Sequence, residues 1–455
     1  MRPAGPEPSA ERVQRLVEWA LGAGVLRPED TAHLVTVVTD TVAAIVGASV
    51  EPEVMAAGVA APNTGGIGPS TVLATGCGTS PGAAALANGL AAVRLELDEG
   101  HAHAANHPSA HTLPAVLAVA EELDASGSEL LEAAAAAYEV AVRVARGVHL
   151  RRVVHPFGTA MACGAAVGVA RLRRCDVATT TQAMLIAAAL TPASTQRAAN
   201  TGATVRNALT GATAANGVLA VELAAGGTSG DPLALETVYG EVLGESFDGE
   251  QLDLELGTLR YLTTGYLKLH ACSRWNHAPI EATEALLASD GFGPGDVESV
   301  EVATYDPATR LDGRDPPTGF AGKHSIPYAV AARIVRRDNG IEAYTDEAAA
   351  DPVLRAVMAR VTVVEDPVMT AAVPDVRGAR VTVRTRDGRT LTATEDHPPG
   401  GADRPYPPAD IAAKHRSLLA RALPGDAVDA VLGWCAGLPG AGSVRGLQTA
   451  VGARR

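Results

Sequence analysis

Residues 128–145 read SELLEAAAAAYEVAVRVA and show the helical pattern that runs through most of this 455-residue chain. Apolar residues recur at helical spacing, Ser128 is an N-cap residue type, and Gly147 stands just past the end. The stretch 112–123 precedes it across the turn DASG, which predicts a helical hairpin. Similar stretches, rich in the Ala and Gly that closely packed helices require, cover residues 158–172, 179–190 and 212–225.

The pattern changes after residue 268. Residues 297–304 (VESVEVAT) alternate apolar and polar side chains as a half-buried strand does, and Asp387-Gly388 is a strong hairpin turn signal. Three more strands are predicted at residues 360–364, 380–386 and 389–395, with helices at 326–336, 352–360, 409–423 and 426–436.

These patterns predict a mainly α protein with a large all-helical domain built from both ends of the chain. Residues 1–267 form its first part and residues 403–455 return to it. Residues 268–402 form a smaller α+β lid domain between them.

Composition excludes several classes of protein. The formal net charge of −14 leaves no positive surplus for a nucleic-acid partner. Five scattered cysteines without CxxC spacing exclude a disulfide framework or a thiolate zinc site. Residues 1–9 are predicted to be a loose tail without the apolar stretch of a signal peptide, and apolar runs are too short to span a membrane. We therefore expect a cytoplasmic protein.

The chemistry is concentrated in residues 96–111, ELDEGHAHAANHPSAH, with three carboxylates and four histidines. Histidine titrates near neutral pH, so this crowding favours proton transfer or substrate-carboxylate binding. A metal site is an alternative, although no strict signature such as HExxH occurs. The alternative without a functional role is that these histidines are solvated side chains of a loop. No motif for a nucleotide cofactor or a nucleophile elbow is present, so we expect no cofactor.

Several segments, in this order, resemble the MmgE/PrpD family: ELDEG…HPSAHTLPAVLAVAE, VHPFGT (154–159), GATVRNALTGATAANGVLA (202–220), LKLHACSRWNH (267–277) and KHSIPYAVA (323–331). The resemblance implies a helical domain made of both chain ends, a smaller lid and a homodimer. It also implies dehydration, decarboxylation or epimerisation of small polycarboxylic acids without a cofactor.

The resemblance assigns candidate site residues one by one. His107 is the first choice for general acid or base, with Asp98 orienting it. One departure is that Gly100 stands where the family has Thr, so a hydroxyl is lost there. A second is that Arg206 replaces a family lysine, which suits carboxylate binding rather than proton shuttling. The other candidates from the resemblance are Lys268, His155 and Tyr328 for catalysis, and Glu96 and His277 for substrate binding. Arg274 is a further substrate-binding candidate because its charge suits a carboxylate.

The expected function is therefore a lyase acting on a di- or tricarboxylic acid, with a dehydratase like 2-methylcitrate dehydratase as the leading reaction. A decarboxylase or an epimerase is the nearest alternative. A non-catalytic acid-binding protein and a metal-dependent hydrolase are alternatives of other classes. Among single residues, Tyr328 and His277 are also explained by core packing, and Lys323 by a charge on the lid surface.

Overall fold

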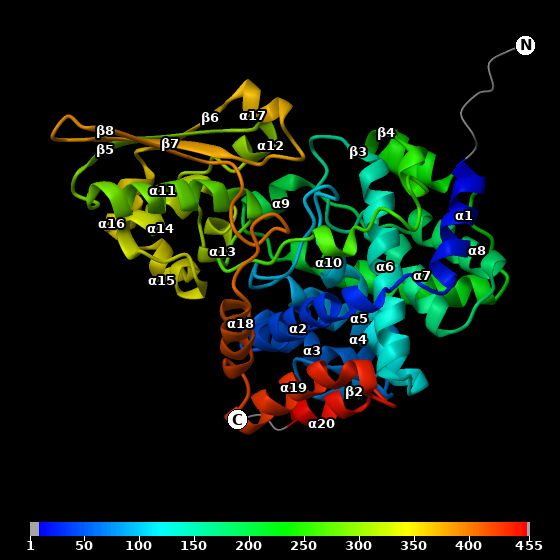
Figure 1. The fold of residues 1–455 in the computed structure, drawn as a ribbon. Coiled ribbons are helices and arrows are strands. Elements are labelled where there is room, and N and C mark those ends of the chain that lie inside the picture. The colour runs from blue at the N-terminus through cyan, green and yellow to red at the C-terminus, as the bar shows by residue number, and fades with distance from the viewer. Residues whose placement is uncertain (1–8, 453–455) are drawn as a thin grey trace, which may run out of the picture.

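The computed structural model describes residues 9–452, and helices dominate this range, which confirms the predicted mainly α class. Most of the predicted tail lies outside the described residues. Figure 1 shows a large helical body beside a smaller part that carries a four-stranded sheet. The body begins with the helices α1 (Ser9–Leu21), α2 (Thr31–Ala48), α3 (Pro52–Gly65), α4 (Pro81–Ala92), α5 (Pro108–Leu123), α6 (Gly127–Gly147), α7 (Met161–Leu172), α8 (Val177–Ala189), α9 (Gln196–Asn200) and α10 (Val205–Ala225).

The predicted hairpin is formed by α5 and α6, with earlier starts than the sequence suggested. The N-cap of α6 is Ser126 rather than Ser128, because Ser126 and Glu129 make a reciprocal capping box. Pro108 opens α5, four residues before the predicted start, because proline is well suited to the first position of a helix. Two short antiparallel strand pairs border the helices: β1 (Ser70–Val72) with β2 (Cys77–Thr79), and β3 (Val148–Leu150) with β4 (Gly244–Phe247).

Glycine allows the helices of the body to approach closely. A Cβ atom at Gly211 of α10 would lie 2.2 Å from the Leu86 carbonyl oxygen of α4. A Cβ at Gly164 of α7 would lie 2.2 Å from the Ala137 carbonyl oxygen of α6. Both distances are far below any real contact, so these helix pairs depend on the absence of a side chain.

The smaller part contains the sheet, in the order β6-β5-β7-β8. β5 (Val297–Thr304) pairs in parallel with β6 (Val361–Glu365) and antiparallel with β7 (Ala379–Thr385), and β7 forms the predicted hairpin with β8 (Thr390–Glu395). Figure 1 shows its main helices on one face of the sheet. The helices of this part are α11 (His277–Asp290), α12 (Asp306–Thr309), α13 (Gly319–Gly322), α14 (Ile326–Arg336), α15 (Asp346–Ala349), α16 (Pro352–Met358) and α17 (Pro367–Ala371).

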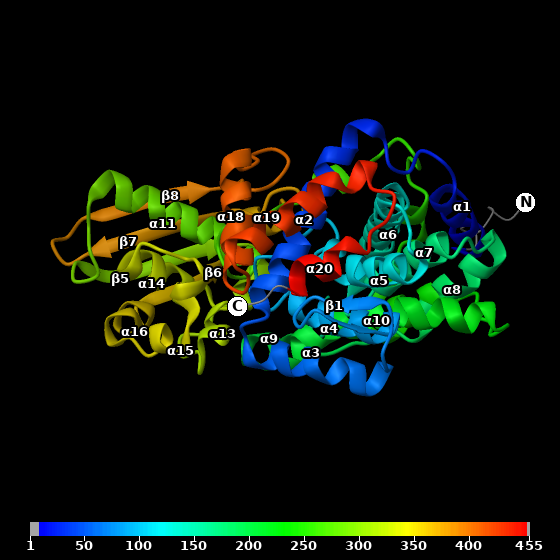
Figure 2. The ribbon, with the colours of Figure 1, turned by 90° about the horizontal axis from the view of Figure 1, so that it is seen from below.

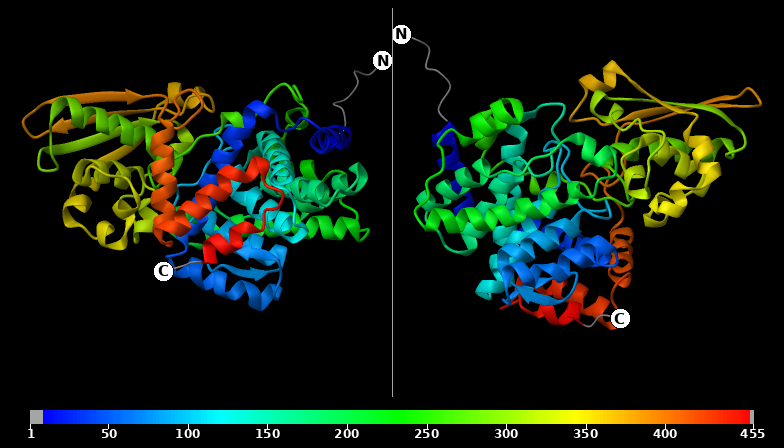
Figure 3. Two further views of the ribbon diagram at one scale, coloured as in Figure 1. Left: turned by 60° about the horizontal axis from the view of Figure 1, so that its bottom comes forward. Right: turned by 180° about the vertical axis from the view of Figure 1, so that it is seen from behind.

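The last helices, α18 (Pro408–Ala420), α19 (Gly425–Gly437) and α20 (Gly446–Gly452), lie on the helical body. Figures 2 and 3 show them crossing the face that contains α2. Lys414 of α18 places its Nζ 2.5 Å from Asp40 Oδ1 of α2, and His415 Nε2 lies 3.0 Å from the same oxygen. The C-terminal segment is therefore tied to the N-terminal one by a buried ionic contact.

Among residues 9–452, two helical segments, Pro28–Ala48 and Val205–Ala225, are long and apolar enough to cross a membrane by length and composition alone, so the expectation that the apolar runs are too short is wrong for them. Within the protein, 72% and 56% of their most apolar windows are buried against other elements.

The close approach of α4 and α10 makes Gly211→Ala a sharp test of the packing. We expect the free energy of unfolding to fall by about 1–3 kcal/mol, because the new methyl group meets a backbone carbonyl that cannot move away freely. The control is Gly433→Ala in α19, where a Cβ would meet nothing within 4 Å. That change should stabilise the helix by about 0.5–1 kcal/mol. Urea denaturation measures both, and equal effects would contradict this account.

Candidate active site

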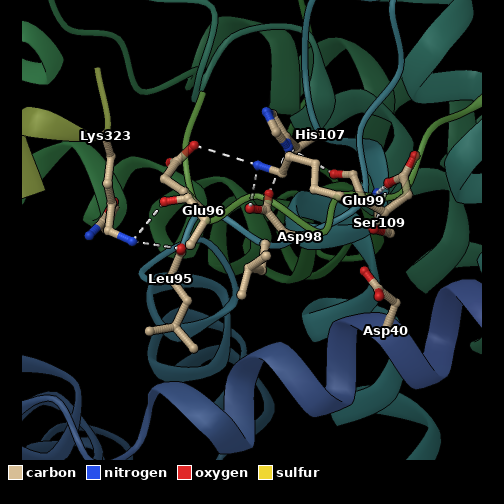
Figure 4. A network of polar contacts seen from close by, with 12 residues as sticks. Asp40, Leu95, Glu96, Asp98, Glu99, His107, Ser109 and Lys323 are labelled. Carbon is tan, nitrogen blue, oxygen red and sulfur yellow. Dashed lines mark hydrogen bonds and ion pairs between the residues drawn. The ribbon is translucent and has the colours of Figure 1, made fainter. Parts of the chain in front are cut away.

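Residues 93–107 between α4 and α5 leave helical geometry and carry most of the predicted site. Glu96 has a backbone φ of 57°, in the left-handed region that non-glycine residues adopt at a cost of about 1–3 kcal/mol. Figure 4 shows Glu96, Asp98 and His107 gathered at one place along this segment. The strained turn thus serves to bring acidic side chains and a histidine together.

His107 and Asp98 form a buried dyad. His107 Nδ1 lies 2.6 Å from Asp98 Oδ2 and 2.8 Å from the Glu99 carbonyl oxygen. Because both neighbours are acceptors, Nδ1 carries a hydrogen, and Nε2 is the ring nitrogen that remains for proton transfer. Burial disfavours the charged form of Asp98, but His107 and Lys268 outweigh it and lower its pKa to about 2. Asp98 therefore stays ionised and orients the ring.

Glu96 is surrounded by cations. It forms an ion pair with Arg206, and its Oε2 lies 3.5 Å from Lys268 Nζ, which is also 3.3 Å from Asp98 Oδ1. Burial opposes ionisation of Glu96, yet the charges of Arg206 and Lys268 hold its pKa well below its usual range. Arg206 also stacks over the Phe157 ring at 3.8 Å. Two carboxylates and two cations thus form one buried network at the floor of the site.

A cavity of about 50 Å³ lies between this network and the lid, with room for no more than a few water molecules. Arg274 and Arg377 reach it from the lid. Arg274 donates to the carbonyl oxygens of Pro398 and Pro399, both at 2.7 Å, and stacks over Tyr266 at 4.7 Å. The lining residues are Glu96, Ala105, His107, His155, Pro156, Phe157, Gln196, Arg206, Tyr266, Ser273, Arg274, Trp275, Leu311, His324 and Arg377.

Two further histidines line the cavity in the neutral form. Burial, together with nearby Arg206, holds the pKa of His155 well below its usual range. Phe157 N donates to His155 Nδ1 at 3.1 Å, so the hydrogen of His155 lies on Nε2 and that atom can act as a donor. Burial also lowers the pKa of His324 to about 4, although nearby Glu96 opposes this shift.

Comparisons with known proteins show the family to which the chain belongs. The model of the MmgE/PrpD N-terminal domain matches residues 14–254, and that of the MmgE/PrpD C-terminal domain matches residues 270–436. The chain belongs to the MmgE/PrpD family. The resemblance predicted from five short segments is therefore confirmed.

Among known relatives of this MmgE/PrpD protein is the cis-aconitate decarboxylase of Aspergillus terreus. The two are 25% identical over 381 residues, which cover 77% of each chain. The same enzyme from Aspergillus terreus strain NIH 2624 matches to the same extent. The family thus includes lyases that act on polycarboxylic acids.

The structure brings most of the predicted site residues together, but not all of them. Tyr328 does not line the cavity, because its hydroxyl donates to the Ala343 carbonyl oxygen at 2.8 Å in the core of the lid. His277 does not line the cavity either, and its Nδ1 lies 3.2 Å from Nη1 of Arg274, which does. The residues that the structure brings to the cavity or the network beneath it are Glu96, Asp98, His107, His155, Arg206, Lys268 and Arg274.

Among the cavity residues that sequence reasoning missed, three have titratable side chains: Tyr266, His324 and Arg377. His324 lies inside the KHSIPYAVA segment, so its place next to Lys323 was an available signal. Tyr266 and Arg377 stand in connecting segments with no motif of their own. Lys323, for its part, is no surface charge, since it is 2% exposed and donates to the carbonyl oxygens of Leu95 and Ala271.

The remaining histidines of residues 96–111 have structural surroundings. His101 Nε2 lies 2.9 Å from Thr264 Oγ1, and His111 Nδ1 lies 2.7 Å from the His107 carbonyl oxygen. Burial lowers the pKa of both to about 3. Within residues 9–452, no three His, Cys, Asp or Glu side chains are arranged to hold a metal ion.

These buried neutral histidines predict a pH dependence of stability. Below pH 6.5 the unfolded chain binds protons at His101 and His111, whereas the folded protein does so only near pH 3. The free energy of unfolding should therefore fall as the pH decreases from about 6.5, by about 1.4 kcal/mol per pH unit for each histidine. Urea denaturation at several pH values measures this slope. His111→Gln should reduce this slope by the contribution of one histidine. An unchanged slope would contradict the conclusion that His111 is buried in the neutral form.

Proposed function

We propose that this MmgE/PrpD protein is a lyase that removes a proton from a carbon next to a carboxylate of a small di- or tricarboxylic acid. Dehydration is the leading reaction. The observation that carries the proposal is the His107–Asp98 dyad beside a cavity that three arginines line. A base with a fixed tautomer and a positive pocket is what such a substrate requires.

The proposed elimination uses the histidines in complementary roles. His107 Nε2 takes the proton from carbon, and the electron pair of that C–H bond forms the new C=C bond. The C–O bond on the neighbouring carbon breaks while the His155 Nε2–H donates a hydrogen bond to its oxygen, and the departing hydroxide takes the proton that His107 removed and leaves as water. Asp98 stabilises the imidazolium that forms on His107. Each step uses side chains of this chain, so the proposal needs no cofactor.

The arginines are proposed to hold the substrate carboxylates. Arg274 and Arg377 form none of the ion pairs found among the described residues, and the Nε atoms of Arg206 and Arg377 are buried without a protein partner. Arginine can bind a carboxylate in a bidentate manner through such donors. In a protein with a net charge of −14, this local excess of cations favours an anionic substrate.

Decarboxylation is a second candidate, because a relative that matches most of the chain is a cis-aconitate decarboxylase. In that reaction the C–CO₂ bond breaks, CO₂ leaves, and the electron pair stays on carbon until protonated His107 supplies a proton. The same residues serve both reactions. An epimerase would instead return the proton to the opposite face of the same carbon.

Incubation with 2-methylcitrate, citrate, cis-aconitate and iminodisuccinate in D₂O, followed by NMR, separates these reactions. Loss of water or of CO₂ identifies the two lyase reactions, and deuterium incorporation without a new product identifies an epimerase. Binding without turnover or exchange would leave an acid-binding protein, and no interaction with any polyacid would overturn the proposal. Stoichiometric metal that is essential for activity would overturn the cofactor-free mechanism.

His107→Gln should abolish most turnover. The amide has no basic nitrogen, and a positioned general base contributes about 10²–10⁴-fold to the rate. The matched control is His103→Gln, because His103 is a half-buried histidine of the same segment outside the cavity lining. Its kcat should stay near the wild-type value. Equal kcat for the wild type and His107→Gln would contradict the role of the dyad.

Arg377→Gln should weaken substrate binding more than it slows the chemical step. A hydrogen bond to a charged group contributes about 1.5–3 kcal/mol, so KM should rise about 10- to 100-fold. Arg384 of β7 is exposed and serves as the control for loss of an arginine from the lid. Initial rates give kcat and KM for both variants, and an unchanged KM for Arg377→Gln would refute the role of this arginine.

The homodimer and the cytoplasmic location expected from the sequence are part of the same proposal. Light scattering of the purified full chain tests the first expectation. A molar mass of one chain across the working concentration range would overturn it.

A further inference from the structure

Gly100 and Tyr266 are locked together next to the dyad. The Gly100 N–H donates to the Tyr266 carbonyl oxygen at 3.0 Å, and the Tyr266 N–H donates back to the Gly100 carbonyl oxygen at 2.7 Å. A Cβ atom at Gly100 would lie 2.4 Å from the Tyr266 hydroxyl oxygen. The phenol of Tyr266 therefore occupies the space that any side chain at position 100 would need.

The Tyr266 hydroxyl has no hydrogen-bond partner among the described residues, although the residue is only 6% exposed. Tyr138 donates to Glu99 at 2.6 Å and Tyr328 donates to Ala343 at 2.8 Å. The buried Tyr261 hydroxyl also lacks a partner, but Tyr261 is not among the residues that line the cavity, whereas Tyr266 is. Buried tyrosine hydroxyls normally find a partner. A hydroxyl that lines a cavity without one is placed to meet a ligand.

The surroundings of Tyr266 are those of the active site. Its ring centroid lies 6.3 Å from that of His107, and the Arg274 guanidinium lies 4.7 Å above it. Burial raises the pKa of Tyr266, so the hydroxyl keeps its hydrogen at neutral pH and is a donor. A donor between a base and an arginine matches a carboxylate or a hydroxyl of a bound acid.

We propose that the Tyr266 hydroxyl contacts the substrate and donates a hydrogen bond to it, from the place where a side chain at position 100 would otherwise stand. This inference rests on the proposed function and names a substrate-contacting residue for it. Glycine at position 100 is then a consequence of the phenol, because both cannot occupy the same space. Gly100 has no side chain that could offer a hydroxyl to the cavity. Tyr266, 166 positions further along the chain, offers one instead.

Tyr266→Phe tests the hydroxyl while it keeps the ring on Gly100 and under Arg274. On the polyacid that the wild type converts, kcat/KM should fall about 10- to 100-fold, as expected for loss of a hydrogen bond to a charged group. The melting temperature should not change, because the hydroxyl has no protein partner to lose. Tyr328→Phe is the matched control: it removes a hydroxyl that does have a partner, so it should lower the melting temperature and leave kcat/KM near the wild-type value.

A second pair of variants tests whether the Tyr266 phenol occupies the space that a side chain at position 100 would need. Gly100→Thr should reduce activity, because its Cβ collides with the phenol. In the double variant Gly100→Thr/Tyr266→Ala, the second change removes the phenol. The introduced threonine can then place its own hydroxyl at the cavity. The double variant should then be more active than Tyr266→Ala alone. A double variant no more active than Tyr266→Ala would contradict the inference.

The two proposals fail in different ways. If the wild type neither converts, exchanges nor binds any polycarboxylate, the proposed function fails and the inference falls with it. If the wild type is active and Tyr266→Phe keeps the wild-type kcat/KM, only the role of the hydroxyl is overturned. If Tyr266→Phe loses activity together with melting temperature, the residue is structural and the inference is also overturned.

Discussion

All three lysines of the chain converge on residues 95–98, and the rest of the site depends on this clamp. Each lysine comes from a different part of the protein: Lys268 from the connection to the lid, Lys323 from the lid and Lys414 from the C-terminal helix α18. A buried lysine nitrogen is costly unless its hydrogens find acceptors, so each contact also holds a separate part of the chain in place. The partners within residues 95–98 are the Leu95 carbonyl for Lys323, the Leu97 carbonyl for Lys414, and the carboxylates of Glu96 and Asp98 for Lys268.

This clamp explains how a strained segment can serve as the floor of an active site. Glu96 keeps its positive φ because Arg206 and Lys268 hold its carboxylate. The other two lysines hold the carbonyl groups of the neighbouring residues Leu95 and Leu97. The two carboxylates are neutralised by these two cations, so the arginines of the lid remain available as excess positive charge. The anionic protein can therefore present a cationic pocket without a large basic surface.

The sequence predicted regular elements well where local patterns decide them. The strand β5 and the helix α14 have the predicted bounds, because alternation and periodicity depend only on neighbouring residues. The acidic and histidine segment was also located, because four of the twelve histidines of the chain fall within its sixteen residues. What failed were side-chain directions across long separations. Tyr328 belongs to a matching segment yet points into the lid core, while Tyr266 reaches the site only because Gly100 leaves room for it.

The cavity lies where the smaller part that carries the sheet meets residues 95–107 of the helical body. The contacts between the two parts there include the hydrogen bonds of Lys323 to Leu95 and of Arg377 to Ala102. The contact of Arg377 ends next to the segment that carries the dyad, and the same arginine lines the cavity. Arg206 comes from the helical body, whereas Arg274 and Arg377 come from the smaller part, so the cations that line the cavity meet only because the two parts pack against each other. The same packing buries these charges, and charge interactions are stronger in a buried place than in water.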